Sequence, residues 1–412
     1  MSASYVIVGD GIAGSSAAER LREEAPDAEI TIVTDEGEPL YNRILIKEYA
    51  KGKLPEAPIS IHDHGWYDDH RIDLRLNTLV TEIDPDAKVV RTHEGESIAY
   101  DRLLIAAGGT PAQLPVENAD AEGVHHFWTF EDARAIKAAA EAAETGVVVG
   151  AGLLGIDLAA ICGAQDVDAH YLMRGDRWWR YALTRDGAEI VHDALRGIGV
   201  TPVFNSGVDR FETDADGRVT AAIDPNGDRY ACDWAGVAIG LDFNTEILQG
   251  TGVECDDGVV VDEYMHTSVE DVYAAGDLTR FYDTILDDYE QNGSWGSAKE
   301  QGAVAARNMV DPESEAFRWV SSYSITHFDF PFLSFGHPTI GEEYAERRYS
   351  ETEWRRLAFV DDRIVGGVLI GDLSAQAAYK RLMREERAVA DRTDLLLKKS
   401  VDVDRIVPPH EQ

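Results

Sequence analysis

Two short apolar runs in this chain each lead into a glycine-rich turn of the form Gly-x-Gly-x-x-Gly. After each turn, apolar residues recur at the spacing of an α-helix. In such a unit of strand, turn and helix, the glycines permit a sharp turn and let a pyrophosphate approach the helix N-terminus. A single match is weak evidence, but both matches here have the expected strand before them and helix after them. The sequence therefore predicts an α/β protein with two Rossmann-like dinucleotide-binding domains. The predicted pyrophosphate-binding glycines are Gly9, Gly11, Gly14, Gly150, Gly152 and Gly155.

An acidic pair follows the first of these units. Asp35 and Glu36 come after the strand-like segment 29–34, at roughly the 20-residue distance at which a carboxylate binds the adenosine ribose. We expect Asp35 rather than Glu36 to be the main ligand. The alternative is that both residues form a surface turn after a strand.

Two further segments complete a pattern that resembles the FAD/NAD(P)-dependent pyridine nucleotide oxidoreductase family over residues 1–310. Segment 101–111 is similar to the family's strand that returns to the FAD domain, and segment 272–277 is similar to its second FAD signature. The resemblance implies that FAD binds at the first glycine turn and a nicotinamide dinucleotide at the second. It assigns to FAD the further residues Ala107, Gly108, Gly276 and Asp277.

The same resemblance implies three domains. The FAD-binding domain would comprise residues 1–112 and 241–310, and the NAD(P)-binding domain, 113–240, would be inserted into it. The segment 311–412 resembles the α+β interface domain of the nitrite and rubredoxin reductase branch, which caps the flavin and often joins subunits. We therefore expect a glutathione-reductase-like fold with an α+β C-terminal domain, as a monomer or a homodimer.

Candidate catalytic residues come from segment 39–49, which is similar to the rubredoxin reductase and assimilatory nitrite reductase branch, where a cation lies near flavin N5. The resemblance carries this role to Arg43, with Lys47 second. Asp157 stands where the family usually has a glutamate beside the nicotinamide, and its shorter side chain leaves the pairing with a cation open. The alternative for Arg43 is a surface arginine. The resemblance also implies that Glu300 and Gln301 open a helix near the isoalloxazine.

Two signals for the choice of coenzyme disagree. Gly155, the third glycine, is more often linked with NADH. The segment after the next strand, however, has no carboxylate for a ribose 2′-hydroxyl and instead offers Arg174, Arg177 and Arg180. Because a guanidinium grips a 2′-phosphate with two hydrogen bonds, we favour NADPH over NADH. The alternative is that these arginines pair with nearby aspartates.

The chain carries a formal charge of −38, spread along its whole length. A field of this sign repels nucleic acid and anionic lipid, so neither is expected as a partner. The composition indicates adaptation to high salt, with a basic protein partner as the alternative. No apolar run approaches the roughly 20 residues that cross a bilayer, and no leader precedes the first strand, so we expect a cytoplasmic protein.

Three cysteines, Cys162, Cys232 and Cys255, lie far apart, so neither a redox-active disulfide nor a metal site is expected. Electrons should therefore leave the flavin directly for a separate acceptor. A rubredoxin or ferredoxin-type carrier is favoured. The alternatives are a quinone or other small molecule, or a redox-sensing flavoprotein whose nucleotide state controls association with another protein.

Overall fold

The computed structural model describes residues 2–407 and divides the chain into two compact units. Unit 1 is built from Met1–Asn42, Ala57–Thr110 and Asp242–Ser321, and unit 2 from Arg43–Glu56, Pro111–Leu241 and Ser322–Gln412. The chain passes between them five times, and two of these crossings lie in β8 (Gly109–Pro111) and β17 (Leu241–Phe243). The three-domain division expected from the sequence stays a prediction.

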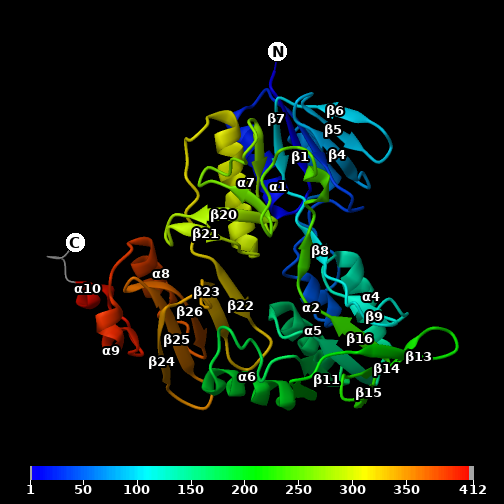
Figure 1. The fold of residues 1–412 in the computed structure, drawn as a ribbon, viewed down its shortest axis with the longest axis vertical. Coiled ribbons are helices and arrows are strands. Elements are labelled where there is room, and N and C mark those ends of the chain that lie inside the picture. The colour runs from blue at the N-terminus through cyan, green and yellow to red at the C-terminus, as the bar shows by residue number, and fades with distance from the viewer. Residues whose placement is uncertain (1, 408–412) are drawn as a thin grey trace. The chain divides into compact units, whose positions relative to one another are not determined.

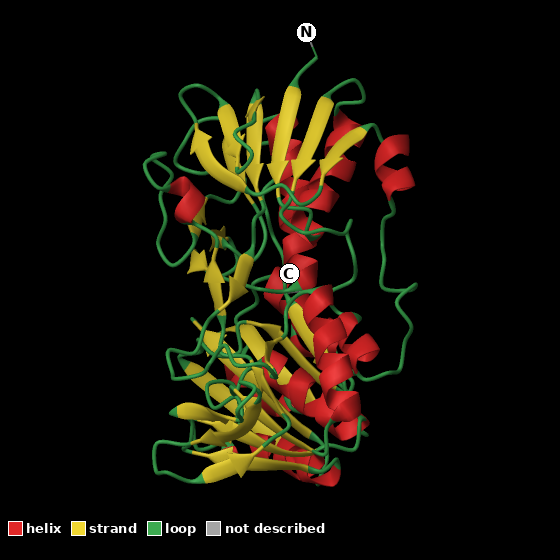
Figure 2. Ribbon diagram, turned by 90° about the vertical axis from the view of Figure 1, so that its right-hand side faces the viewer, coloured by secondary structure: helices red, strands yellow, loops and turns green. Residues whose placement is uncertain are grey.

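Unit 1 is organised around a parallel sheet in the order β19-β7-β1-β2-β3 (Figures 1 and 2). Its central strands are apolar on both faces, as buried parallel strands are, and Ile7, Ile32 and Leu104 have no exposed surface. Helices α1 and α7 pack on each other and contribute to this core. The strands are β1 (Ser4–Val8), β2 (Glu29–Val33), β3 (Ile72–Arg75), β7 (Arg102–Ile105) and β19 (Val272–Ala274), and the helices are α1 (Ile12–Glu24) and α7 (Trp295–Val310).

Smaller elements complete unit 1. Three antiparallel strands follow β3, and a second small sheet lies in the order β18-β20-β21. The elements are α3 (His64–Asp69), β4 (Val80–Asp84), β5 (Val89–Thr92), β6 (Ser97–Ala99), η1 (Glu246–Leu248), β18 (Val259–Val261), β20 (Thr279–Asp283) and β21 (Asp288–Glu290).

Unit 2 repeats the architecture with a parallel sheet in the order β12-β11-β10-β16-β9. An antiparallel sheet, β13-β14-β15, packs beside it and shares its core. The elements are α2 (Ile46–Ala50), β9 (Val124–His126), α4 (Phe130–Ala142), β10 (Thr145–Val149), α5 (Leu153–Ala164), β11 (Asp168–Met173), α6 (Arg185–Gly197), β12 (Val200–Phe204), β13 (Arg210–Thr213), β14 (Val219–Ile223), β15 (Arg229–Ala231) and β16 (Trp234–Val237).

The last part of unit 2 is an antiparallel sheet, β22-β23-β26-β25-β24, followed by short helices. This arrangement confirms the α/β class with an α+β segment at the C-terminal end. The elements are β22 (Ser322–Ile325), β23 (Phe332–Gly336), β24 (Glu343–Arg348), β25 (Trp354–Val360), β26 (Arg363–Ile370), α8 (Gln376–Arg384), η2 (Ala390–Arg392), α9 (Thr393–Leu396) and α10 (Val403–Ile406).

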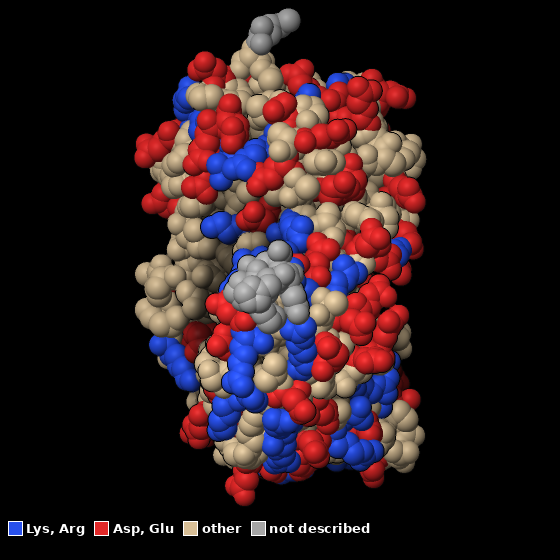
Figure 3. Space-filling view, turned by 90° about the vertical axis from the view of Figure 1, so that its left-hand side faces the viewer, with Lys and Arg blue, Asp and Glu red and all other residues tan. Residues whose placement is uncertain are grey.

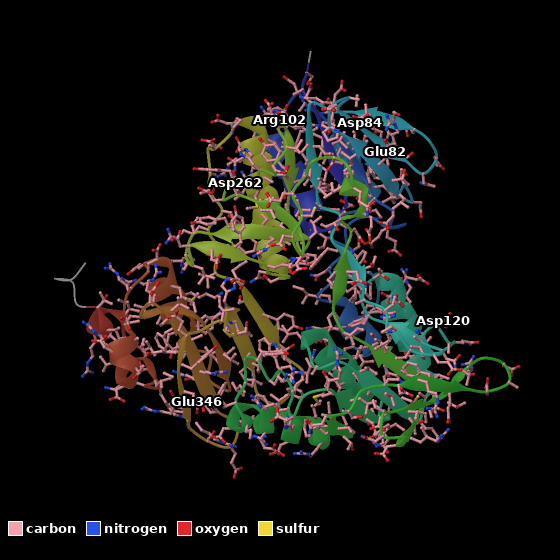
Figure 4. All side chains as sticks on the ribbon, in the orientation of Figure 1. Glu82, Asp84, Arg102, Asp120, Asp262 and Glu346 are labelled. Carbon is pink, nitrogen blue, oxygen red and sulfur yellow. The ribbon has the colours of Figure 1, made fainter. Side chains whose placement is uncertain are left out.

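The negative charge is distributed over many elements. Figure 3 shows Asp and Glu side chains interspersed with Lys and Arg on one face. Within residues 2–407, no helix is long and apolar enough to span a bilayer, and no cluster of three or more potential metal ligands occurs. Acidic residues labelled in Figure 4 come from two strands and two loops, in both units: Glu82 and Asp84 of β4, Glu346 of β24, and Asp120 and Asp262 in loops.

The contact between α1 and α7 leads to a stability prediction. A Cβ on Gly302 of α7 would lie 2.0 Å from the Ala13 carbonyl oxygen of α1, so Gly302→Ala must push the two helices apart. We expect this variant to lose about 2 kcal/mol or more in the free energy of unfolding, measured by urea denaturation. Gly197→Ala in α6 is the matched control, because a Cβ there meets nothing within 4 Å and should stabilise the helix slightly. Equal stability of the two variants would contradict the prediction.

Candidate functional site

The first glycine turn joins β1 to α1 and leaves open space at the helix N-terminus. Gly9 has a φ of +107°, and a Cβ there would lie 2.3 Å from the Ala106 carbonyl oxygen. A Cβ on Gly14 would lie 2.0 Å from the Gly9 carbonyl oxygen, so the fold itself requires both glycines. Gly11, the N-cap residue, differs because a Cβ there meets nothing within 4 Å. The space in front of Gly11 and the first-turn amides of α1 therefore suit a pyrophosphate.

The second glycine turn, between β10 and α5, has the same geometry. Gly150 has a φ of +118°, and its Cβ would lie 1.9 Å from the Ala238 carbonyl oxygen. Gly155 approaches the Gly150 carbonyl oxygen, to which a Cβ would come within 2.5 Å. Gly152 is the N-cap residue of α5, and a Cβ there again meets nothing within 4 Å. The chain thus has two separate turns of the kind that binds a dinucleotide pyrophosphate.

The acidic pair lies at the carboxyl edge of the first sheet, beside the first glycine turn. Val33 at the end of β2 pairs with Val8 at the end of β1, and Asp35 follows two residues later. Asp35 is exposed, whereas Glu36 accepts a hydrogen bond from the Tyr41 hydroxyl at 2.7 Å. Glu36 thus has a structural contact, and Asp35 as the ribose ligand stays a prediction.

The arginines predicted to select the coenzyme follow β11, the strand next to β10. Arg174 and Arg180 are exposed, and Arg180 donates to the Tyr181 hydroxyl at 2.7 Å. Arg177 instead pairs with Asp176 at 2.7 Å, which is the structural role that the sequence left open. Two of the three guanidiniums therefore lie at the surface at the end of β11.

The remaining residues assigned to FAD belong to unit 1. Gly108 has a φ of +58°, and the Ala107 carbonyl oxygen accepts a hydrogen bond from the Asn244 amide at 2.8 Å. Gly276 has a φ of +94° and follows β19, which pairs with β7, and Asp277 comes next. A Cβ on Gly293 would lie 3.6 Å from the Asp277 carboxyl carbon, so a loop passes close to this side chain.

The start of α7 differs from the sequence prediction. The helix begins at Trp295 rather than at Glu300, because the Ser294 side chain accepts a hydrogen bond from the Ser297 amide and caps it. Glu300 and Gln301 therefore lie in the second turn of the helix and do not open it. The buried Gln301 oxygen accepts from the Gly276 amide at 2.7 Å, so this side chain fixes the turn after β19.

Of the two candidate cations, Lys47 is the one that lies beside Asp157. Its ammonium nitrogen is 3.4 Å from Asp157 Oδ1, and both side chains are less than a tenth exposed. Arg43 donates to the Trp128 carbonyl oxygen at 2.9 Å and lies over the Trp128 ring. The structure thus pairs Asp157 with Lys47, the second of the two candidate cations, and it places Arg43, the first, against Trp128.

Asp157 accepts hydrogen bonds from two further side chains of unit 2. His327 Nε2 is 2.5 Å from Oδ1, and the Tyr323 hydroxyl donates to Oδ2 at 3.2 Å. Burial alone would raise the pKa of Asp157, but the hydrogen bond from His327 and the charges of Lys47 and Lys51 hold it below the ordinary value. Burial and the negative charge of Asp157 raise the pKa of Tyr323 well above its ordinary value. Asp157 is therefore ionised and Tyr323 protonated at neutral pH.

Sequence reasoning missed the partners that surround Asp157. Lys51 Nζ lies 2.5 Å from His327 Nδ1 and 2.9 Å from Glu48 Oε1. Lys51 and His327 are 276 positions apart in the chain, and no sequence motif marks Tyr323, His327 or Lys51. Only the folded unit 2 reveals this group, which we call the Asp157 cluster: Lys47, Glu48, Lys51, Asp157, Tyr323 and His327.

A second buried carboxyl was also missed, between the first two glycines of the first glycine turn. Asp10 is 7% exposed, and its Oδ2 accepts from the Tyr67 hydroxyl at 2.7 Å and from the Leu40 amide at 3.1 Å. Its Oδ1 is buried without a hydrogen-bond partner among the described residues. Burial raises the pKa of Asp10 to about 7, against the lowering effect of the Tyr67 and Leu40 hydrogen bonds.

The three cysteines, Cys162, Cys232 and Cys255, are free thiols. Cys162 is buried in α5, and burial raises the pKa of its thiol to about 12. Cys232 is also buried, with its pKa raised to about 12 for the same reason. Neither thiol is a ready nucleophile at neutral pH.

Comparisons with known proteins place these features among reductases. The profile described as pyridine nucleotide-disulphide oxidoreductase matches residues 3–302, and that of the rubredoxin NAD+ reductase C-terminal domain matches residues 324–387. The chain is 33% identical to rhodocoxin reductase of Rhodococcus erythropolis, over 68% of this chain and 65% of that protein. It is 26% identical to the assimilatory nitrate reductase electron transfer subunit of Bacillus subtilis, over 89% of this chain and 47% of that protein.

A solved reductase structure is also similar to this chain. The covalent complex of putidaredoxin reductase with putidaredoxin contains a chain that is 26% identical, with a TM-score of 0.91 and 98% of each chain covered. The present chain spans about half to two thirds of the length of the curated relatives described above.

Proposed function

Because the chain belongs to the pyridine nucleotide-disulphide oxidoreductase family, we propose that it is a reductase that takes hydride from NAD(P)H and delivers electrons through FAD to a small redox-protein carrier. FAD and NAD(P)H are the cofactors of this family and of the relatives of the chain. The observation that carries the proposal is the pair of glycine turns, each with open space in front of its N-cap glycine. The C-terminal match and the two named reductases support a protein carrier as the acceptor.

Bound FAD supplies the redox chemistry, because it accepts a hydride and releases electrons to a separate acceptor. The chain contributes binding and orientation. The first turn, with Asp35, would hold the FAD pyrophosphate and ribose, and the second turn would hold the nicotinamide nucleotide. Asp157 lies in the helix that begins at this second turn, so we assign the Lys47 and Asp157 pair to the nicotinamide end of that nucleotide.

The proposal is tested by following the flavin of the purified protein without oxygen and in high salt. Adding NADPH or NADH should bleach the flavin absorbance within seconds, and an added rubredoxin or [2Fe–2S] ferredoxin should then be reduced faster than a quinone. Protein that carries no flavin would rule out the enzyme function. If the quinone is reduced and neither protein carrier is, the acceptor is a small molecule rather than a redox protein. Slow bleaching with both nucleotides would favour the redox-sensing alternative. Location in the cytoplasm and adaptation to high salt stay predictions.

The coenzyme preference has its own test. Replacing Arg174 and Arg180 together with alanine should raise the KM for NADPH about a hundredfold or more, because two guanidinium–phosphate contacts of about 1.5–3 kcal/mol each are lost. The KM for NADH should stay nearly unchanged. Arg185→Ala, which removes an exposed arginine that pairs with Asp176, is the control and should affect neither. Bleaching by NADH alone in the unmodified protein would overturn the preference for NADPH.

A further inference from the structure

The hydrogen-bonding chemistry of the Asp157 cluster fixes the protonation of His327. A lysine ammonium has donors and no acceptor, so His327 Nδ1, which faces Lys51 at 2.5 Å, must accept. The ring proton then resides on Nε2 and is donated to Asp157 Oδ1 at 2.5 Å. Burial lowers the pKa of His327 below its ordinary value, which agrees with a neutral ring. Burial lowers the pKa of Lys51, and the hydrogen bond that Lys51 donates to Glu48 opposes this lowering and favours the ammonium form.

Asp157 Oδ1 is shared between His327 and Lys47. The imidazole approaches it more closely than the Lys47 ammonium does, at 2.5 Å against 3.4 Å, and its side chain is 1% exposed. His327 lies in the loop between β22 and β23, whereas Asp157 is in α5 and Lys47 in α2. The C-terminal segment therefore reaches the carboxylate that sequence reasoning assigned to catalysis, and it does so through the side chains of His327 and Tyr323.

We propose that His327 is a positioning residue, which keeps Asp157 ionised and correctly oriented so that the Lys47 and Asp157 pair is preset beside the second glycine turn. This inference rests on the proposed function, because that function gives the pair its role in hydride transfer. The groups that face Asp157 or its partners are Lys47, Glu48 and Lys51 of the α2 segment, Lys53 after it, Tyr171 of β11, and Tyr323 of β22. His327 donates a shorter hydrogen bond to the carboxylate than Tyr323 or Lys47 does.

Two substitutions separate the ring's two contacts. In His327→Gln, the side-chain amide occupies the place of Nε2 and retains a donor for Asp157. In His327→Asn, the shorter amide occupies the place of Nδ1, so it reaches Lys51 but not Asp157. Loss of this donor should raise the pKa of Asp157, because the His327 hydrogen bond is the main effect that lowers it against burial.

The test measures the rate of flavin reduction by NAD(P)H in stopped flow from pH 5 to 9, with the dissociation constant of the nucleotide measured separately. His327→Asn should gain an acid limb, with a rate that falls progressively below that of the unmodified protein as the pH decreases toward about 5 and matches it by about pH 8, since the ionised fraction of a carboxyl falls about tenfold for each pH unit below its pKa. His327→Gln should keep the profile of the unmodified protein. A shared, pH-independent loss in both variants, or no change in either, would overturn the proposal.

The tautomer of His327 can also be measured by NMR in the unmodified protein, so this second test does not depend on turnover or on the folding of the variants. In ¹⁵N-histidine-labelled protein, one imidazole should show the neutral tautomer with the proton on Nε2 from pH 5 to 9, and its signals should vanish in His327→Gln. A His327 ring protonated on Nδ1, or one that titrates within this range, would refute the inference. If instead NAD(P)H fails to reduce the flavin of the unmodified protein, the proposed function fails, and the tautomer measurement still decides the state of His327.

Discussion

Gly11→Val should yield a protein that folds but has lost its flavin, whereas Gly152→Val should keep the flavin and no longer accept hydride from NAD(P)H. At both positions a side chain meets no protein atom within 4 Å, and both backbones are in the extended region that valine favours. The added side chain would instead fill the space that a pyrophosphate needs. Losing two charge-assisted hydrogen bonds of about 1.5–3 kcal/mol each should weaken binding about a hundredfold or more.

The two variants control for each other. Flavin content after gel filtration reports the first turn, and the rate of flavin reduction by NADPH and NADH reports the second. Dithionite, which needs no nucleotide site, should reduce Gly152→Val as fast as the unmodified protein. Loss of flavin from Gly152→Val, or its retention in Gly11→Val, would show that the nucleotides are assigned to the wrong turns.

The sequence predicted local features of the site because each is encoded within a few residues. The turn around Gly11 and the turn around Gly152 needed only a strand, three glycines and a helix, and the family match over residues 3–302 confirms the recognition based on them. The start of α7 was missed because the residue that caps it carries no distinctive sequence signal. Ser294 is one serine among many in the sequence, and only the folded chain shows that it caps the helix five residues earlier than predicted.

Contacts between distant segments could not be predicted in this way. The sequence offered two cations near position 45 and one carboxylate at position 157, without a means to pair them. The fold selects Lys47, because Arg43 is held by the Trp128 carbonyl group. His327 was out of reach altogether, since its role depends on a loop that meets α5 from 170 positions away.

Asp10→Asn should make the protein more stable at alkaline pH, and the gain should disappear in acid. The folded-state pKa of Asp10 is raised from 3.8 to about 7, chiefly by burial, whereas an unfolded chain leaves the carboxyl in water. A raised pKa means that the protonated group favours the folded state, so this stability is fully present below about pH 4 and is lost as the pH rises through about 7. At about 1.4 kcal/mol per pH unit, the loss reaches at most about 4 kcal/mol above pH 7.

Asparagine is the neutral isostere of the protonated Asp10, and its oxygen can still accept from the Tyr67 hydroxyl and the Leu40 amide. Urea unfolding from pH 4 to 9, at a fixed FAD concentration, should therefore show curves for the two proteins that meet in acid and separate above neutrality. Asp68→Asn on α3 removes an exposed carboxylate and is the control, with no comparable separation expected. Parallel curves for Asp10→Asn and the unmodified protein would contradict the prediction.

The same carboxyl should couple flavin binding to pH. Asp10 stands between Gly9 and Gly11 of the turn that we assign to FAD, so its ionised form would repel the two negative charges of the pyrophosphate. Binding of the anion then favours the protonated carboxyl, and by linkage the affinity for FAD should fall as the pH rises above about 7. Titration of the flavin-free protein with FAD should give this slope in the unmodified protein and a flat profile in Asp10→Asn. If the FAD affinity of Asp10→Asn still falls with rising pH, a group other than Asp10 causes the pH dependence of flavin binding.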